Sequence, residues 1–202
     1  MIDNEIIELK VILLGESGTG KTNLLNVCCN LKFNSNNIPN ISASYLEKKV
    51  VISNITYGLK FWDTAGQEKY RSLNNIFIKD SNICIFVYDV TRPDTFKELN
   101  YWVEAAKEIL GKKATFAIVA NKIDLEQKVK KEEGENLAEN IEGFFFEASA
   151  KNDKGEFSEF VDKLVNEYLK KNCLEGWEII SLEGRISLST NAHKKKNHHQ
   201  CC

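Results

Sequence analysis

Residues 15–22 read Gly-Glu-Ser-Gly-Thr-Gly-Lys-Thr and directly follow an apolar run, Val11 to Leu14. This spacing is typical of a loop that wraps phosphate groups, because glycines let successive backbone N–H groups point inward and the following helix adds the positive end of its dipole. We expect Lys21 to neutralise the β- and γ-phosphates of a nucleotide, and Thr22 to offer its hydroxyl to a Mg²⁺ that those phosphates share. A plain glycine-rich turn is the alternative, but the strand before the loop and the amphipathic stretch from Asn23 to Leu31 favour the phosphate site. The other residues of this region that we expect to line the nucleotide are Gly15, Gly18, Thr19, Gly20 and Asn23.

Short apolar runs and helical patterns alternate along residues 1–172. Helical spacing recurs over 96–110, behind the start signal Thr91-Arg92-Pro93-Asp94, and again over 157–168. The pattern predicts an α/β fold, a doubly wound, mostly parallel six-stranded sheet with helices on both faces and its ligand at the carboxyl ends of the strands. The expected strands are Ile6–Leu14, Tyr45–Ile52, Tyr57–Trp62, Ile83–Tyr88, Ala114–Ala120 and Phe144–Phe146, the second and third forming a hairpin with a turn near Ser53-Asn54.

Charge and cysteine usage narrow the class of protein. The formal net charge of −2 gives no overall positive field, which argues against a nucleic-acid partner. The six cysteines lack the spacing of a disulfide framework, and the acidic residues before the first apolar run do not fit a signal peptide. We therefore expect a reduced, cytoplasmic protein with Cys28, Cys29 and Cys84 as ordinary core residues. Beyond residue 172 the periodicity stops, so residues 173–202 are predicted to be a flexible tail.

Asp63 ends the second strand of the expected hairpin, within Trp62-Asp63-Thr64-Ala65-Gly66-Gln67-Glu68. A carboxylate on an otherwise apolar strand is costly unless it has a polar task, and here it suits a water on Mg²⁺. We expect the Gly66 N–H to approach a γ-phosphate and Gln67 to orient the water that attacks it. A plain turn with an exposed Gln is the alternative for this motif taken alone.

Asn121-Lys122-Ile123-Asp124 follows the strand 114–120 and therefore lies at the same sheet edge as the phosphate loop. The Asp124 carboxylate can accept hydrogen bonds from guanine N1–H and its 2-amino group together, a pair that adenine does not offer. Lys122 is expected to lie along the base, and Asn121 to tie this loop to the phosphate loop. After the next strand, the Ala150 N–H is expected on guanine O6, with Ser149 and Lys151 beside it. A charged turn that caps a helix is the alternative for this motif taken alone.

These motifs, in this order, resemble the Ras superfamily of small GTPases, and within it the Rab family, over residues 6–172. The Rab-like segments are 60–68, Tyr70-Arg71-Ser72-Leu73, Tyr88-Asp89-Val90-Thr91 and the terminal Cys201-Cys202. The resemblance implies a GDP/GTP switch with loops near residues 33–46 and 64–80, Phe33 edge-on against the guanine, and Ser17 as a phosphate-loop residue. It also implies a role in vesicle and membrane traffic.

Switch I departs from the family pattern, since Asn40-Ile41-Ser42 stands where the family has a threonine that binds Mg²⁺ and the γ-phosphate. An Asn side-chain oxygen can also contact Mg²⁺, although its reach differs, and Ser42 or Ser44 offers a hydroxyl instead. We expect reduced coupling between the γ-phosphate and switch closure. An interaction module with the GTPase fold and impaired cycling therefore stands as the alternative function, against which the retained Gln67 argues.

No arginine lies in the switch I loop, so we expect slow hydrolysis of GTP to GDP and phosphate, accelerated by an activating protein that supplies an arginine. The resemblance further implies an exchange factor, effectors, a GDP dissociation inhibitor and a prenylation escort. A P-loop nucleoside kinase or ATPase is disfavoured because it would have no use for the guanine-reading carboxylate.

The basic tail ends His198-His199-Gln200-Cys201-Cys202. Metal binding by these side chains is disfavoured because four ligands within five residues leave no loop to wrap an ion. The resemblance instead implies geranylgeranyl groups on Cys201 and Cys202, with Lys194 to Lys196 attracting anionic lipid. We expect reversible attachment to the cytosolic face of endomembranes or the plasma membrane.

Overall fold

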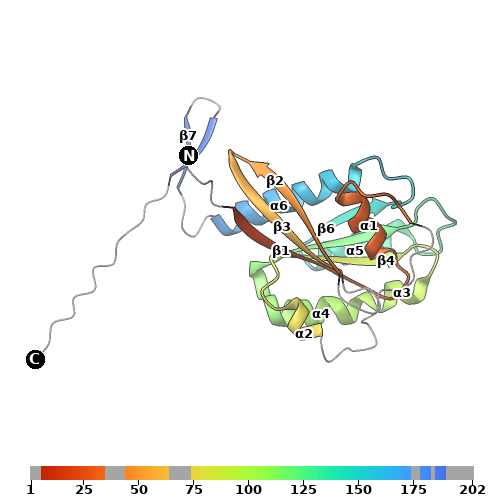
Figure 1. The fold of residues 1–202 in the computed structure, drawn as a ribbon. Coiled ribbons are helices and arrows are strands. Elements are labelled where there is room, and N and C mark those ends of the chain that lie inside the picture. The colour runs from red at the N-terminus through yellow and green to blue at the C-terminus, as the bar shows by residue number, and fades with distance from the viewer. Residues whose placement is uncertain (1–5, 35–43, 64–73, 174–177, 183–184, 190–202) are drawn as a thin grey trace, which may run out of the picture.

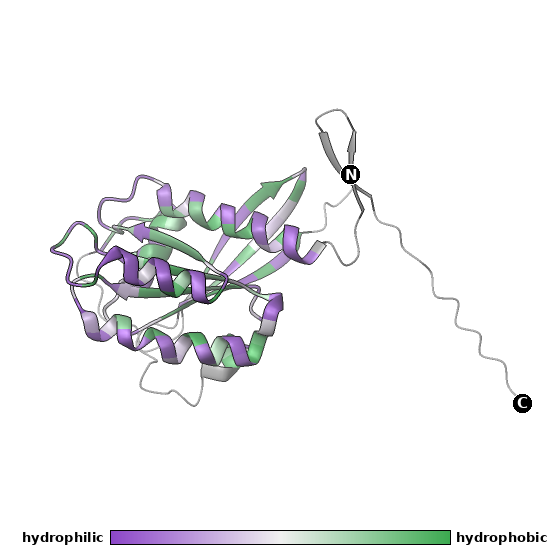
Figure 2. Ribbon diagram, turned by 180° about the vertical axis from the view of Figure 1, so that it is seen from behind, coloured by the Kyte–Doolittle hydropathy of each residue, from purple (hydrophilic) through white to green (hydrophobic). Residues whose placement is uncertain are grey.

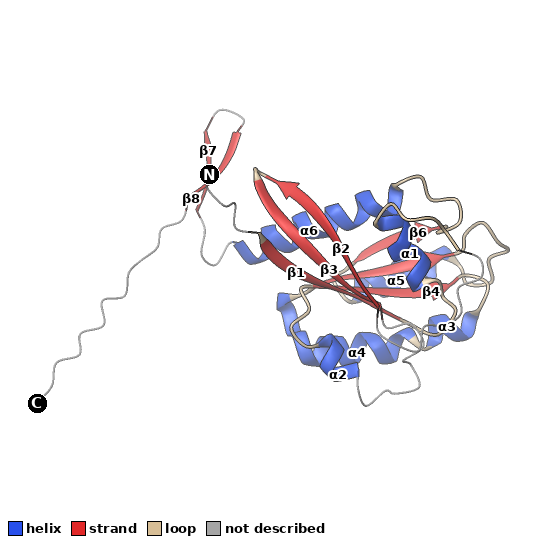
Figure 3. Cartoon of the chain, in the orientation of Figure 1, coloured by secondary structure: helices blue, strands red, loops and turns tan. Residues whose placement is uncertain are grey.

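A twisted sheet with the strand order β2-β3-β1-β4-β5-β6 organises the chain (Figures 1 and 3). The structure is a computed structural model that describes residues 6–34, 44–63, 74–173, 178–182 and 185–189. Strand β2 pairs antiparallel with β3, and the remaining neighbours in this sheet pair parallel. The strands are β1 (Ile7–Leu14), β2 (Ser44–Ile52), β3 (Ile55–Asp63), β4 (Ile83–Asp89), β5 (Thr115–Asn121) and β6 (Phe144–Ala148). The predicted doubly wound, mostly parallel α/β sheet is confirmed.

Helices cover both faces of this sheet (Figure 1). Residues of α1 and α6 join the core on one face, and residues of α2, α4 and α5 join the core on the other. The helices are α1 (Lys21–Cys28), α2 (Asn74–Ile78), α3 (Pro93–Lys97), α4 (Leu99–Leu110), α5 (Lys131–Asn140) and α6 (Glu156–Cys173), with a short 3₁₀ turn at Gly111–Lys113. Coloured by hydropathy, the helices show apolar and polar stripes along their length (Figure 2). Within the described residues no helix is long and apolar enough to cross a bilayer.

The central strands are buried on both faces because their side chains alternate between the two cores. In β1, Val11 and Leu13 join the core under α1 and α6, whereas Ile12 and Leu14 join the core under α4 and α5. All four are fully buried. The apolar runs in the sequence are therefore unbroken, and such runs predict strands that are buried on both faces.

The predicted hairpin of β2 and β3 is confirmed, with Ile52 opposite Ile55. Its two turn residues, Ser53 and Asn54, have φ angles of 50° and 64°. Two left-handed residues in a two-residue loop match the right-handed twist of the flanking strands. The hairpin thus delivers Asp63 to the edge of the sheet where β1 ends.

Several elements differ from the sequence expectations. The helical pattern over 96–110 is divided between α3 and α4 around Glu98. Helix α5 was not predicted, because only Gly134 and Ala138 of it are buried, and small residues give a weak periodic signal. In the tail, where no regular element was expected, β7 (Glu178–Leu182) and β8 (Arg185–Ser189) form a two-stranded antiparallel sheet. Five-residue strands carry too few alternations to stand out from a polar tail.

Candidate functional site

The loop after β1 bends through backbone conformations that favour glycine. Gly15, Gly18 and Gly20 have φ angles of 139°, 79° and 97°. A Cβ on Gly15 would lie 2.1 Å from the Val87 carbonyl oxygen, and one on Gly20 would lie 2.3 Å from Nδ2 of Asn121. The glycines therefore serve close packing of the loop against β4 and β5 as well as the turn itself.

Lys21 lies across this loop and is 3% exposed. Its Nζ donates to the carbonyl oxygens of Gly15, at 2.7 Å, and Glu16, at 2.8 Å. The loop is closed further by Thr19, whose hydroxyl donates to the Glu16 carbonyl at 2.9 Å. The Lys21 ammonium is thus held in place against this loop, where a positive charge suits an anion.

Thr22 and Asp63 meet at the ends of α1 and β3. The Thr22 hydroxyl donates to Oδ2 of Asp63 at 2.6 Å, and Asp63 is 1% exposed. Parallel pairing places Asp63 opposite Leu13, one residue before the end of β1, which brings the carboxylate beside the phosphate loop. Hydroxyl and carboxylate oxygens are the donors that Mg²⁺ prefers, so this pair fits the metal that the sequence predicted.

Asn121 joins the phosphate loop to the loop after β6. Its Nδ2 donates to the Thr19 carbonyl at 2.8 Å, and its Oδ1 accepts from the Ala150 N–H at 3.2 Å. The strand register places Asn121 between Asp89 on β4 and Ala148 on β6, at the carboxyl edge of the sheet. The Ala150 amide, expected on guanine O6, therefore contacts Asn121 in this structure.

Asp124 and Ser149 lie together on the exposed side of this edge. The Ser149 hydroxyl donates to Oδ1 of Asp124 at 2.6 Å and accepts from the Asn152 N–H at 3.2 Å. Lys151 follows as an exposed residue. The serine thus orients the Asp124 carboxylate through Oδ1, a role that the sequence analysis had not given to Ser149.

Asn23 and Phe33 belong to the segment that follows α1. Asn23 exchanges two hydrogen bonds of 3.1 Å with the backbone of Asn34, which holds the end of this segment to the helix. Phe33 is 38% exposed beside it. Of the other predicted site residues, Asn40, Gly66, Gln67, Cys201 and Cys202 lie outside the described residues.

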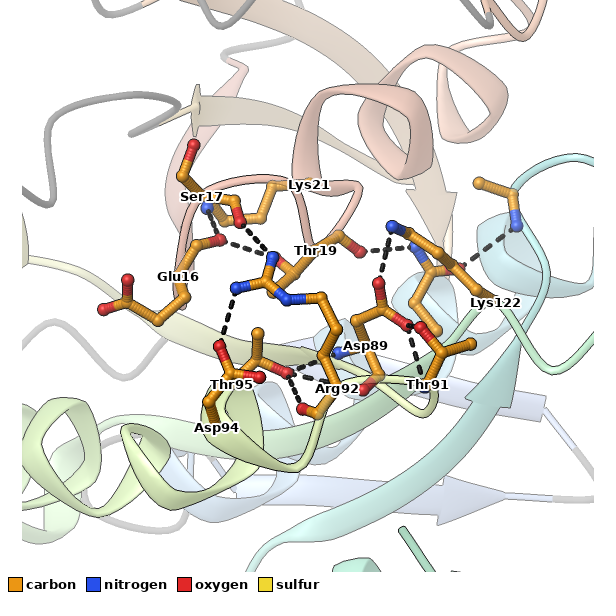
Figure 4. Close-up of polar contacts among 12 residues, drawn as sticks. Glu16, Ser17, Thr19, Lys21, Asp89, Thr91, Arg92, Asp94, Thr95 and Lys122 are labelled. Carbon is orange, nitrogen blue, oxygen red and sulfur yellow. Dashed lines mark hydrogen bonds and ion pairs between the residues drawn. The ribbon is translucent and has the colours of Figure 1, made fainter. Parts of the chain in front are cut away.

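Residues of the turn between β4 and α3 also reach the site, although the sequence analysis gave them no function (Figure 4). Asp89, 1% exposed, forms an ion pair with Lys122 at 2.6 Å, and Arg92 Nη1 donates to the Ser17 carbonyl at 3.1 Å. A carboxylate at the end of the apolar strand 83–88 was the available signal for Asp89, by the same reasoning that selected Asp63.

Cys28 and Cys84 are fully buried, and Cys29 is partly buried. Burial raises the pKa of the Cys28 thiol to about 12 and moves the pKa of Cys84 and Cys29 upward as well. Thiols with raised pKa values carry little of the reactive thiolate at neutral pH. Their expected place in the core is confirmed for Cys28 and Cys84.

Comparison with known proteins gives consistent matches. The sequence model of the Ras family matches residues 10–170. The chain is 43% identical to Ras-related protein Rab-21 of Mus musculus over 155 residues, which cover 76% of this chain and 70% of the relative. It is 42% identical to Rab-21 of Homo sapiens over 155 residues (76% and 69%), and 38% identical to Rab-21 of the sponge Geodia cydonium over 168 residues (82% and 73%).

Proposed function

Because this chain belongs to the Rab family of the Ras superfamily of small GTPases, we propose that the sheet edge described above is its guanine-nucleotide site. The protein is a Rab-like GTPase that hydrolyses GTP and acts in membrane traffic. The G domain is proposed to span residues 1–172, with 173–202 as the tail. The observation that carries the site proposal is the position of Asn121, which bonds the phosphate loop through Thr19 and the base loop through Ala150.

Phosphate binding is assigned to the backbone amides of residues 15–20 and to Lys21. The two carbonyls that hold the Lys21 ammonium lie in the same loop, so phosphate oxygens would compete with them for the same N–H groups. Thr22 and Asp63 would hold Mg²⁺, which supplies charge neutralisation on the phosphates when bound. Ser17, Asn23 and, as a proposed substitute for the family threonine, Asn40 complete this side.

Base recognition is assigned to Asp124, whose carboxylate reads guanine N1–H and the 2-amino group, with Lys122 along the base and Phe33 at its edge. Ser149 holds Asp124 in place at 2.6 Å, and Lys151 continues that loop. The Ala150 amide is proposed to reach guanine O6 by exchanging its 3.2 Å bond to Asn121 for the base.

Hydrolysis forms a bond between a water oxygen and the γ-phosphorus and breaks the bond from that phosphorus to the β,γ-bridging oxygen, whose electron pair stays on GDP. Gln67 is proposed to orient the water, the Gly66 N–H to contact the γ-phosphate, and Lys21 to stabilise the charge that develops on the bridging oxygen. An activating protein is proposed to supply an arginine. The impaired-cycling alternative is not favoured by the relatives named above, which are Rab-21 proteins.

Substitution of Lys21 tests the phosphate site. Lys21→Ala is expected to weaken GDP binding by about 100-fold, because a charge-assisted hydrogen bond contributes up to about 3 kcal/mol. The affinity of the full-length chain for fluorescent GDP is measured by titration in the presence of Mg²⁺. Lys107→Ala on α4 is the matched control, since Lys107 pairs with Glu104 three residues away, at 3.6 Å, in its own helix. Equal affinities for the two variants would contradict the proposal.

Membrane attachment is proposed to depend on lipid chains at Cys201 and Cys202, helped by Lys194 to Lys196. The double variant Cys201→Ser/Cys202→Ser is expected to lose membrane association, and either single variant to bind weakly and reversibly, because one chain gives only marginal anchoring. Fractionation of cells that express each variant measures this. Wild-type membrane retention of the double variant would reject the anchor. The exchange factor, effectors, GDP dissociation inhibitor and prenylation escort are proposed partners.

A further inference from the structure

The turn between β4 and α3, taken here with the flanking residues as 89–95, lies between the two halves of the proposed nucleotide site (Figure 4). At one end, the buried Asp89 carboxylate pairs with Lys122 on the base side at 2.6 Å. At the other, the Arg92 guanidinium donates to the Ser17 carbonyl of the phosphate loop at 3.1 Å. One short turn therefore contacts both loops that the nucleotide would bridge.

The backbone of this turn is fixed by its own hydrogen bonds. Oδ1 of Asp89 accepts from the Thr91 N–H at 2.9 Å and from the Thr91 hydroxyl at 2.8 Å. The Thr95 hydroxyl donates to the Arg92 carbonyl at 2.7 Å, and Pro93 fixes φ at the start of α3. The Arg92 side chain thus extends from a backbone that has little freedom to move away from the phosphate loop.

The guanidinium divides its donors between two acceptors. Nη1 bonds the Ser17 carbonyl, and Nη2 bonds Oδ2 of Asp94 at 2.7 Å. That ion pair raises the pKa of Arg92 further above its ordinary value, so the side chain stays charged. Nη1 also lies 3.5 Å from the place where a Cβ on Gly18 would stand, which puts the charge directly beside the loop.

The direction of the Ser17 carbonyl decides where the next amide points. In a trans peptide the C=O and the following N–H point in opposite directions, and the described chain contains no cis peptide bond. The Ser17 carbonyl points toward Arg92, whose guanidinium fixes it in that direction. The Gly18 N–H consequently points away from Arg92, the side on which we place the phosphates. Gly18 has a φ of 79°. Because glycine has no side chain, its backbone can readily leave this conformation.

We infer that Arg92 is a positioning residue for the nucleotide: its bond to the Ser17 carbonyl keeps the Gly18 amide aimed at the phosphates and slows nucleotide release. This inference rests on the proposed guanine-nucleotide site. Asp89 acts in parallel on the base side by holding Lys122, so the turn links the two loops through side chains that need not touch the nucleotide.

Three variants of the full-length protein test the role of Arg92. Arg92→Ala is expected to release fluorescent GDP about three- to tenfold faster than the wild type, the range that corresponds to loss of one hydrogen bond. Arg92→Lys should recover part of the wild-type release rate. Its ammonium can still donate to the Ser17 carbonyl, but it lacks the planar, forked set of N–H donors of a guanidinium. Asp94→Ala is the matched control, since it removes the ion pair and leaves the bond to Ser17. The rate of GDP release from Asp94→Ala should stay within about twofold of the wild-type rate, because an exposed ion pair contributes little.

Release rates are measured by displacement with excess unlabelled GDP in the presence of Mg²⁺, and urea unfolding of each variant accompanies them. Equal acceleration by Arg92→Ala and Asp94→Ala would overturn the inference, because Arg92 would then only stabilise the start of α3. Slower GTP hydrolysis with unchanged GDP release in Arg92→Ala would also overturn the inference. The Arg92 guanidinium would then stabilise the transition state of hydrolysis and not the bound nucleotide. A wild-type chain that binds no GDP would instead reject the nucleotide site, and the role of Arg92 with it.

Discussion

Asp124→Asn is expected to change the base that this GTPase prefers from guanine to xanthine. A carboxylate accepts from guanine N1–H and the 2-amino group, whereas an amide presents one acceptor and one donor. The amide therefore fits xanthine, which has an N–H beside a carbonyl at that edge. GDP affinity should fall by about 10⁴-fold, because a site built to satisfy a polar pair strongly rejects a ligand that leaves it unpaired. Competition of GDP and XDP against fluorescent GDP or XDP measures the change.

Glu126→Gln is the control for this substitution, since Glu126 is an exposed carboxylate on the same loop, two residues from Asp124. It should bind GDP as the wild type does. If Asp124→Asn kept its preference for GDP over XDP, the assignment of Asp124 to the base would be wrong. Ser149 would then be bonded to a carboxylate with only a structural role.

Gly15→Ala is expected to lower the free energy of unfolding by about 3 kcal/mol or more, since backbone strain and overpacking each cost about 1–3 kcal/mol. Its Cβ would lie 2.1 Å from the Val87 carbonyl oxygen, and Gly15 has a φ of 139°. The obstacle is the backbone of a central strand, which cannot rotate away as a side chain can. Urea unfolding followed by circular dichroism, with nucleotide removed by EDTA, gives the difference.

Gly111→Ala separates strain from collision. Gly111 also has a positive φ, 58°, but nothing lies within 4 Å of the place where its Cβ would stand. Its ψ is −144°, a combination that is largely restricted to glycine, so we expect this variant to lose about 1–3 kcal/mol from backbone strain alone. Equal losses in the two variants would mean that β4 yields to the added methyl group.

Sequence patterns predicted those parts of the fold in which burial is repetitive. The run that became β4 is buried at every position, so neither its type nor its limits depended on distant contacts. Helix α5 was not predicted because most of its residues are exposed to solvent. Its buried residues are Ala138 and Gly134, and Gly134 lies against Phe145 and Tyr88. Small residues in a polar segment give a weak periodic signal.

The site residues that the sequence predicted lie in local motifs, whereas those that it missed depend on contacts between distant parts of the chain. Motifs such as residues 15–22 and 121–124 are local, and their spacing alone indicated phosphate and base chemistry. The contacts of Arg92 with Ser17, 75 residues apart, depend on how β1 and β4 pair, which no local pattern specifies. Asn40, Gly66 and Gln67 lie outside the described residues, so their roles stay predictions.

The strand order has a consequence for synthesis of the protein on the ribosome. Strand β1 and its phosphate loop are made first, yet β1 lies between β3 and β4, whose residues follow some 50 to 70 positions later. Asn121 and Ala150, which close the site from the other side, emerge later still. A nascent chain that ends before β4 therefore carries the phosphate loop without its contacts to Val87, Arg92 and Asn121. We expect nucleotide capture to follow the addition of β4 and β5 to the sheet, once the chain has reached Asn121.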